Sequence, residues 1–85
     1  MTPEDVYATL HRHTREVLHH LPPDRITPDS RLADLGADSL DRMDILVGTV
    51  EELGLSLDPT TMAAAPDLAH LARALHRQAT ARPTP

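Results

Sequence analysis

Apolar residues recur every three or four positions in separate segments of this chain, and no segment alternates apolar and polar residues long enough to form a strand. Such spacing puts the apolar side chains on one face of a helix, which must then pack against another element. With 85 residues, the chain is long enough for one domain with a thin core. We therefore predict an all-α fold, a four-helix bundle with three longer helices and one short third helix.

The first helix is predicted to begin near residue 3, because Thr2 can cap free backbone N–H groups and Pro3 suits the first helical position. It is expected to end before Pro22-Pro23. Its apolar stripe is Val6, Leu10, Thr14, Val17 and Leu21. The connection over residues 22–37 is expected to be ordered, because apolar residues are spaced through it as anchors: Ile26, Leu32 and Leu35.

The second helix is predicted to open at Asp38 or Ser39 and to end at Gly54. Gly48 and Thr49 lower its intrinsic stability, so packing must supply most of it. Its apolar side is expected to hold Leu40, Met43, Leu46, Val47, Val50 and Leu53.

Two helices are predicted in the remainder of the chain. A short third helix is expected after Asp58-Pro59 and carries Met62 and Ala65. The last helix is expected to begin with Asp67 as its cap. Its stripe is Leu68, Leu71, Ala72 and Leu75. We assign residues 1–78 to one domain and residues 79–85 to a disordered tail.

Composition excludes several kinds of site. Cysteine is absent, so disulfides, thiolate metal sites and cysteine nucleophiles are excluded, and any reactive thiol must come from outside the chain. There is no run of about 18 apolar residues and no basic segment followed by an apolar one at the N-terminus. We expect a cytoplasmic monomer without a membrane span or signal peptide.

The acidic residues gather in the middle of the chain. The net charge is −5, and residues 34–58 hold seven acids against one base, Arg42. This charge disfavours a nucleic-acid partner. The acidic stretch is interpreted either as a solvated helix face or as a docking surface for basic partners.

The segment Leu35-Gly36-Ala37-Asp38-Ser39-Leu40 places a serine at a helix start, directly after a glycine-containing turn and an acid. Three interpretations are open: a helix cap, a catalytic nucleophile, or an acceptor that another enzyme modifies. The nucleophile is disfavoured, because the hydrolase elbow needs a preceding strand and a closely following glycine, and neither is present.

In this segment the chain resembles the acyl carrier protein family, whose hallmark is Asp-Ser-Leu at the start of the second helix. The resemblance covers residues 26–57 most closely: Asp34-Leu35-Gly36-Ala37-Asp38-Ser39-Leu40-Asp41, then Asp44, Glu51-Glu52 and Gly54. It implies that a phosphopantetheinyl transferase attaches 4′-phosphopantetheine from coenzyme A to Ser39, and that the thiol of this arm carries acyl groups as thioesters. Asp38 would assist by facing the transferase's Mg²⁺. The chain would then be a carrier and not an enzyme, with no catalytic residue of its own.

The resemblance also implies a partner-binding face that meets basic patches on acyl-loading and acyl-processing enzymes. Its residues are Leu40, Asp41, Arg42, Met43, Asp44, Glu51 and Glu52. Arg42 departs from the family's acidic pattern and either narrows the set of partners or is simply solvated. Leu40 and Met43 form either the apolar part of this face or the mouth of an acyl cavity, and for Met43 we favour core packing. The small residues Ala63-Ala64-Ala65 either reshape the acyl space or accompany a looser third helix.

The histidines of the first helix do not predict a metal site. Neither His11 and His13 nor His19 and His20 have the spacing that puts two imidazoles on one helix face. They are interpreted as a face whose positive charge grows as the pH falls through about 6.5, opposite the acidic second helix.

The leading hypothesis is a free-standing type II carrier of fatty acid, polyketide or related biosynthesis, an expectation that rests partly on Met1 and the domain-sized length. The alternatives are a peptidyl carrier, whose motif usually has Gly-Gly where this chain has Gly36-Ala37, and a helical adaptor that is never modified. Replacing Ser39 by Ala separates carrier from adaptor.

Overall fold

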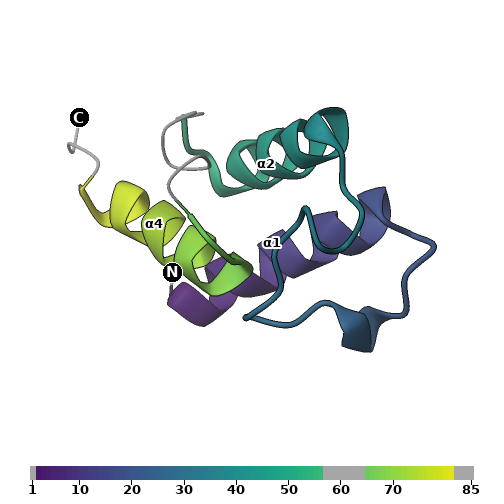
Figure 1. Cartoon of the computed structure of the whole chain (residues 1–85). Helices are drawn as coiled ribbons and strands as arrows, with labels where there is room; N and C mark the ends of the chain where they lie inside the picture. Colours follow the sequence, from purple (N-terminus) through teal and green to yellow (C-terminus); the bar gives the residue numbers. More distant parts are fainter. Residues whose placement is uncertain (1, 57–64, 82–85) are drawn as a thin grey trace.

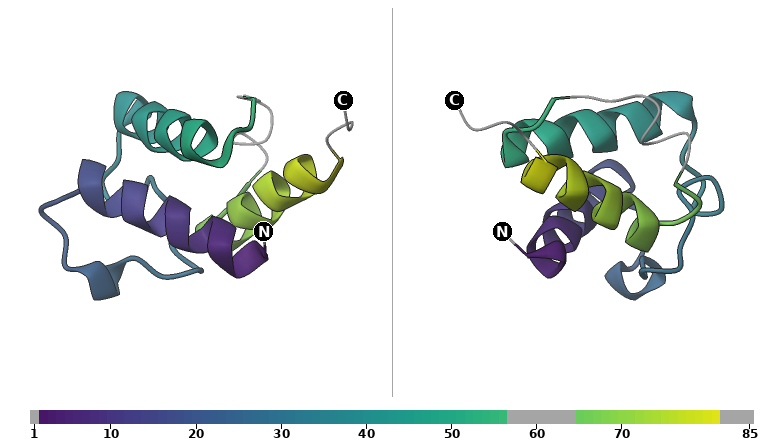
Figure 2. Two further views of the ribbon diagram at one scale, coloured as in Figure 1. Left: turned by 180° about the vertical axis from the view of Figure 1, so that it is seen from behind. Right: turned by 90° about the vertical axis from the view of Figure 1, so that its left-hand side faces the viewer.

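The computed structural model describes residues 2–56 and 65–81, and this part of the chain is helical, without a strand. Its elements are α1 (Pro3–Val17), the 3-10 turn η1 (Pro23–Arg25), α2 (Ser39–Leu53) and α4 (Leu68–Ala81) (Figure 1). α2 runs antiparallel to α1 (Figures 1 and 2). The predicted all-α class is confirmed for these residues. The predicted short third helix falls on residues 58–65, of which all but Ala65 lie outside the described residues.

The helix α1 begins where the sequence predicts. Thr2 and Asp5 form a capping box, in which each side chain accepts a hydrogen bond from the other residue's backbone N–H. The predicted end is wrong, because α1 stops at Val17, four residues before Leu21. Leu18 is the cap residue, with non-helical backbone angles, and its side chain turns into the core. Pro22 disfavours helical backbone angles for Leu21, the last residue of the predicted helix.

The core lies between α1 and the two other long helices. α1 packs against both α2 and α4. The buried apolar side chains are Val6, Leu10, Leu18, Ile26, Leu35, Ala37, Ile45, Leu46, Val50, Leu68, Leu71, Ala72 and Leu75. Two threonines are buried with them, and each hydroxyl donates to the carbonyl four residues earlier: Thr14 to Leu10 and Thr49 to Ile45, both at 2.7 Å. The polar atoms are thus satisfied within their own helices.

The bounds of α2 agree with the prediction, but its buried face is rotated from the predicted one. Asp38 caps the start, and Gly54 ends the helix in the left-handed conformation, with φ 71°. Leu46 and Val50 are buried as predicted. Ile45 and Thr49 are buried although they were not placed in the stripe: Ile45, Leu46, Thr49 and Val50 follow the three- and four-residue steps of one face.

The connection between α1 and α2 is fastened to both neighbouring helices. The carbonyl oxygens of Pro28 and Ser30 accept hydrogen bonds from the backbone N–H groups of Ala69 and Leu68, at 2.9 and 3.0 Å. Two residues before Pro28, the carbonyl oxygen of Ile26 lies 3.2 Å from a ring nitrogen of His11 in α1. The prediction of an ordered connection is confirmed.

The helix α4 starts as predicted, with the Asp67 carboxylate accepting from the backbone N–H of His70 at 2.8 Å. This contact lowers the pKa of Asp67, and the His70 side chain contributes as well. The four residues of its predicted stripe are buried. The helix continues to Ala81, so residues 79–81, predicted to belong to a disordered tail, are helical. None of the described helices is long and apolar enough to cross a membrane.

Candidate functional site

A tight turn directly precedes the start of α2. Gly36 has a φ of 92°, which disfavours any other residue, and Ala37 is buried beneath the turn. Asp38 and Asp41 then form a second capping box, in which Asp38 Oδ1 accepts from the Asp41 N–H at 2.8 Å. The bounds of the helix therefore fix Asp38 as the cap and Ser39 as the first helical residue.

Ser39 is exposed, and its hydroxyl oxygen accepts a hydrogen bond from Arg42 Nη2 at 3.2 Å. One turn of helix separates the two residues, which puts them on the same face. Arg42 itself is half-buried. The guanidinium is therefore not simply solvated, since it donates a hydrogen bond to the candidate acceptor.

Leu40 and Met43 flank Ser39 and are both exposed, with 69% and 40% of their surface accessible. The preference for core packing of Met43 is therefore wrong. The first turns of α2 extend beyond the buried face that begins at Ile45, so apolar residues there are left at the surface. They make the rim of the candidate site apolar.

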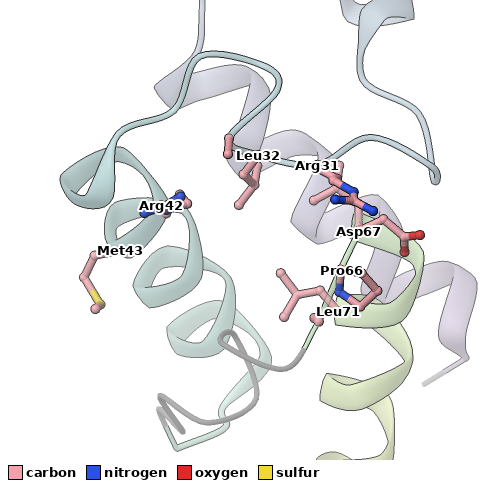
Figure 3. A pocket seen from close by; sticks show the side chains of 10 residues that line it. Arg31, Leu32, Arg42, Met43, Pro66, Asp67 and Leu71 are labelled. Atoms are coloured by element: carbon pink, nitrogen blue, oxygen red, sulfur yellow. The ribbon is translucent and has the colours of Figure 1, made fainter.

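A pocket of about 450 Å³ lies between α2, the connection and the start of α4 (Figure 3), and its lining includes Arg42, the hydrogen-bond partner of Ser39. Its apolar wall is formed by Leu32, Met43, Ala65, Pro66, Leu68 and Leu71. Its charged residues are Arg31, Arg42 and Asp67. Of the Ala-rich segment, Ala65 lines this pocket, while Ala63 and Ala64 lie outside the described residues. A cavity with Leu40 and Met43 at its mouth was one of two interpretations of the sequence. Met43 lines this pocket and Leu40 is not among its lining residues, and the other walls were not predicted because they come from separate segments.

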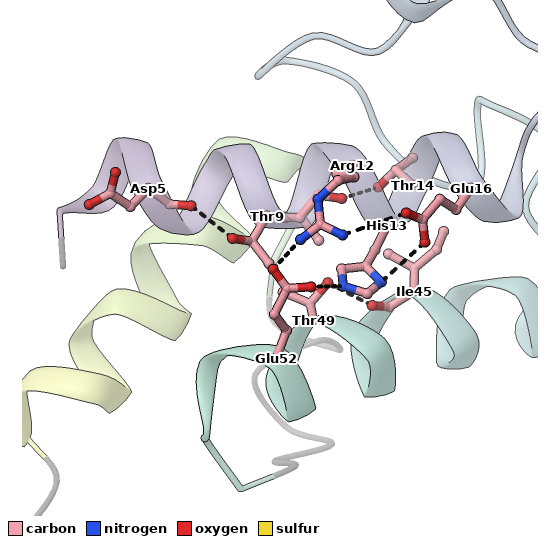
Figure 4. Close-up of polar contacts among 10 residues, drawn as sticks. Asp5, Thr9, Arg12, His13, Thr14, Glu16, Ile45, Thr49 and Glu52 are labelled. Atoms are coloured by element: carbon pink, nitrogen blue, oxygen red, sulfur yellow. Dashed lines mark hydrogen bonds and ion pairs between the residues drawn. The ribbon is translucent and has the colours of Figure 1, made fainter.

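The acidic residues of α2 divide into two groups. Asp44 and Glu51 are exposed, and Asp41 is half-buried and engaged in the capping box. Glu52 instead joins α2 to α1: its carboxylate accepts from Arg12 Nη2, and Oε1 lies 3.0 Å from His13 Nε2 (Figure 4). The Arg12 hydrogen bond, followed by that of His13, lowers the pKa of Glu52. Of the predicted partner-binding residues, Leu40, Met43, Asp44 and Glu51 are thus exposed, Asp41 and Arg42 are half-buried, and Glu52 is paired with α1.

The four histidines predicted to lie in the first helix do not share one role, and His19 and His20 follow the end of α1 at Val17. His13 contacts Glu52 and Glu16, and His11 contacts Ile26, whereas His19 and His20 are exposed. Among the described residues, no group of three or more His, Asp or Glu side chains could hold a metal ion.

The surroundings of Ser39 fit a phosphate ester, the group that the resemblance implies. The oxygen is accessible, stands at the positive end of a fifteen-residue helix and has a guanidinium within hydrogen-bond distance. The carboxylates of Asp38 and Asp41 repel the negative charge of a phosphate ester, but both carboxylates are held in the capping box. Phosphopantetheine would therefore be held covalently by Ser39 and electrostatically by Arg42.

Comparison with known proteins agrees with this geometry. Residues 8–75 match the family model described as phosphopantetheine attachment site. The chain is also 30% identical over 76 residues to the polyketide biosynthesis acyl-carrier-protein AcpK of Bacillus subtilis (strain 168), an alignment that covers 89% of this chain and 93% of that protein. Members of the family are carriers rather than enzymes, and they hold 4′-phosphopantetheine covalently. An exposed serine at the start of α2, an all-helical fold and these matches lead to one conclusion: the chain belongs to the acyl carrier protein family.

Proposed function

We propose that Ser39 is the residue that carries the 4′-phosphopantetheine arm. The observation that supports this most directly is the exposed Ser39 hydroxyl at the first position of α2, beside Arg42 and the pocket. A separate phosphopantetheinyl transferase would activate this hydroxyl, so the chain needs no general base of its own. When bound, the arm supplies a thiol for thioester formation, which a chain without cysteine lacks.

Asp38 assists the modification in this proposal. Its Oδ1 holds the helix cap, and the same carboxylate stands next to Ser39, where the transferase's Mg²⁺ must approach the phosphate. The cap also fixes the backbone of the first turn, which holds the Ser39 hydroxyl at the surface.

The docking face in this proposal consists of Leu40, Asp41, Arg42, Met43, Asp44, Glu51 and Glu52. Leu40 and Met43 supply exposed apolar area, and Asp44 and Glu51 supply charges for basic patches on partner enzymes. Glu52 is expected to contribute least, because its carboxylate is already neutralised by Arg12.

The pocket is the proposed shelter for the acyl chain. Its volume of about 450 Å³ lies within the range of about 300–1,000 Å³ typical of small-molecule sites, and its wall is mostly apolar. Arg42 and Met43, which follow the attachment point by three and four residues, are among its lining residues.

We infer that the acyl groups belong to polyketide biosynthesis, because the Bacillus subtilis relative is a polyketide carrier. Fatty acid or related acyl assembly is the alternative. The proposal includes a short helix within residues 58–65 that completes a four-helix bundle, a carrier domain that ends at Ala81 rather than residue 78, and a cytoplasmic monomer. The exposed large apolar side chains in the described part of the chain, Leu40 and Met43, form too small a patch for a stable dimer.

The test is the intact mass after incubation with coenzyme A, Mg²⁺ and a broad-specificity phosphopantetheinyl transferase, with Ser39→Ala as the matched control. A gain of one phosphopantetheinyl group by the wild type alone is expected. A gain by Ser39→Ala as well would place the arm elsewhere. No gain by folded wild type with several transferases would favour an unmodified adaptor, and loading of the holo protein by an amino-acid-activating enzyme would favour a peptidyl carrier.

A further inference from the structure

A phosphodiester attached to Ser39 would be repelled by the negative charges that already surround this residue. Asp38 and Asp41 place two carboxylates within the same turn, and both are fixed there by the capping box. A phosphodiester on Ser39 adds a third negative charge at short range. The helix dipole offsets only part of this repulsion, since it corresponds to about half an elementary charge.

Arg42 is placed to offset the rest. Its Nη2 stands 3.2 Å from Ser39 Oγ, the atom that becomes the ester oxygen. The unesterified phosphate oxygens are two bonds from this atom, so the guanidinium reaches them with a small rotation of its side chain. No carboxylate of the described residues lies within ion-pair distance of Arg42, although Asp38 and Asp41 are close in sequence.

The position of Arg42 also relates its phosphate contact to the pocket. The same side chain lines the pocket between α2, the connection and α4, on the face opposite Leu71 and Pro66 (Figure 3). A phosphate held by Arg42 would therefore bring the first atoms of the arm close to a side chain that lines the pocket.

We propose that Arg42 is a positioning residue that binds the phosphodiester of the attached arm and holds the root of the arm at the mouth of the pocket. This inference rests on the proposed attachment at Ser39. A guanidinium suits the task better than an ammonium, because its planar fork can donate two parallel hydrogen bonds to phosphate oxygens.

The experiment compares the wild type, Arg42→Gln and Arg31→Gln, each in the unmodified and the modified form. Arg31→Gln is the matched control, because it removes an arginine from the same pocket, on the side of the connection rather than α2 (Figure 3). Thermal unfolding midpoints and the ³¹P resonance of the phosphodiester are measured at low and high salt.

We expect attachment of the arm to lower the midpoint of Arg42→Gln relative to the wild type by on the order of 3 °C, with no such difference for Arg31→Gln. The difference should disappear at about 1 M salt, where charges are screened within about 3 Å. The ³¹P resonance should shift in Arg42→Gln but not in Arg31→Gln. Equal effects of attachment in the wild type and Arg42→Gln, or equal effects of both substitutions, would overturn the inference.

Mass spectrometry keeps this result separate from the test of the attachment site. If the wild type gains no arm, the attachment itself fails and the inference falls with it. If only Arg42→Gln resists modification, the inference is tested on the wild type alone. Its Arg42 guanidinium N–H resonances must then shift when the arm is attached, while the Arg31 resonances stay unchanged. Unchanged Arg42 resonances would overturn the inference although Ser39 is modified.

Discussion

The imidazole of His13 in α1 lies over Gly48 of α2, so close that a Cβ atom at position 48 would stand 2.6 Å from Nδ1 and 2.9 Å from Cε1. Moving the ring aside would break its contact with Glu52, whose Oε1 lies 3.0 Å from His13 Nε2. The glycine that weakens α2 as an isolated helix is therefore what lets α1 approach it.

Gly48→Ala tests this relationship. Alanine adds about 1 kcal/mol of helix propensity, but forcing the ring out of its place costs about 1–3 kcal/mol. We expect Gly48→Ala to lower the free energy of unfolding by about 1 kcal/mol, measured by urea denaturation.

The matched control is the same substitution in a His13→Ala background. There the clash is gone, and we expect alanine at position 48 to stabilise the protein by about 0.5–1 kcal/mol. A change of the same sign in both backgrounds would contradict the close contact as the reason for the glycine.

Glu52→Gln should make stability depend less on pH. The Arg12 hydrogen bond lowers the folded-state pKa of Glu52 below its ordinary value of 4.5, so the pair contributes stability above that pH and loses it as the pH falls through the lowered pKa. The variant should be less stable than the wild type at neutral pH, and the difference should shrink as the pH falls below 4.5 through the lowered pKa of Glu52.

Glu51→Gln is the control for this prediction, since it removes the neighbouring charge and leaves the contacts of Glu52 to Arg12 and His13 in place. Thermal melts from about pH 3 to 7 compare the two variants. An equal loss of stability in both, with the same pH dependence, would show that net charge matters and the link between α1 and α2 does not.

Substitutions of Thr49 distinguish how much its buried hydroxyl and its buried methyl group each contribute to stability. The hydroxyl donates to the Ile45 carbonyl, which can still accept the helical N–H bond when the hydroxyl is removed. Thr49→Val should lie within about 0.5 kcal/mol of the wild type or above it, whereas Thr49→Ala should cost about 1–2 kcal/mol through lost packing. Denaturation of both variants decides: if valine costs as much as alanine, the hydroxyl itself holds α2 in place.

Hydrogen exchange should distinguish the starts of α4 and α2. The N–H groups of Leu68 and Ala69 are bonded to the connection, whereas first-turn N–H groups of a helix ordinarily have no partner. We expect both amides to exchange slowly, at rates set by larger unfolding events, and those of Ser39 and Leu40 at the exposed start of α2 to exchange fast. Equally fast exchange at both starts would mean that the connection opens readily.

Local signals predicted the helix boundaries that local chemistry controls. Pro3, Asp38, Gly54 and Asp67 each act through atoms of the same turn, and the structure places them at helix ends or caps as expected. The end of α1 was missed, although Leu18 continues the four-residue series from Leu10 and Thr14, because Leu21 fitted a longer helix equally well.

The candidate site was predicted only in part, for a physical reason. The motif around Ser39 identifies the acceptor, since its residues are contiguous. The exposure of Met43, the pocket, the contact of Arg42 with Ser39 and the pairing of Glu52 depend on how separate segments or side chains meet. The periodicity of apolar residues in α2 indicates how wide its apolar stripe is. It does not indicate which turns of α2 are covered by α1.

The central place of α1 has a consequence for synthesis. The stripe of Val6, Leu10 and Thr14 is synthesised before α2 and α4, which both pack against α1, and α4 is the later of these two helices. A nascent chain that has emerged from the ribosome only as far as Leu53 can pack α1 against α2. The side of α1 that later contacts α4 is then still exposed to water. Folding of the emerging chain is therefore completed late, and that uncovered stripe is the surface on which a chaperone or a second nascent chain would act.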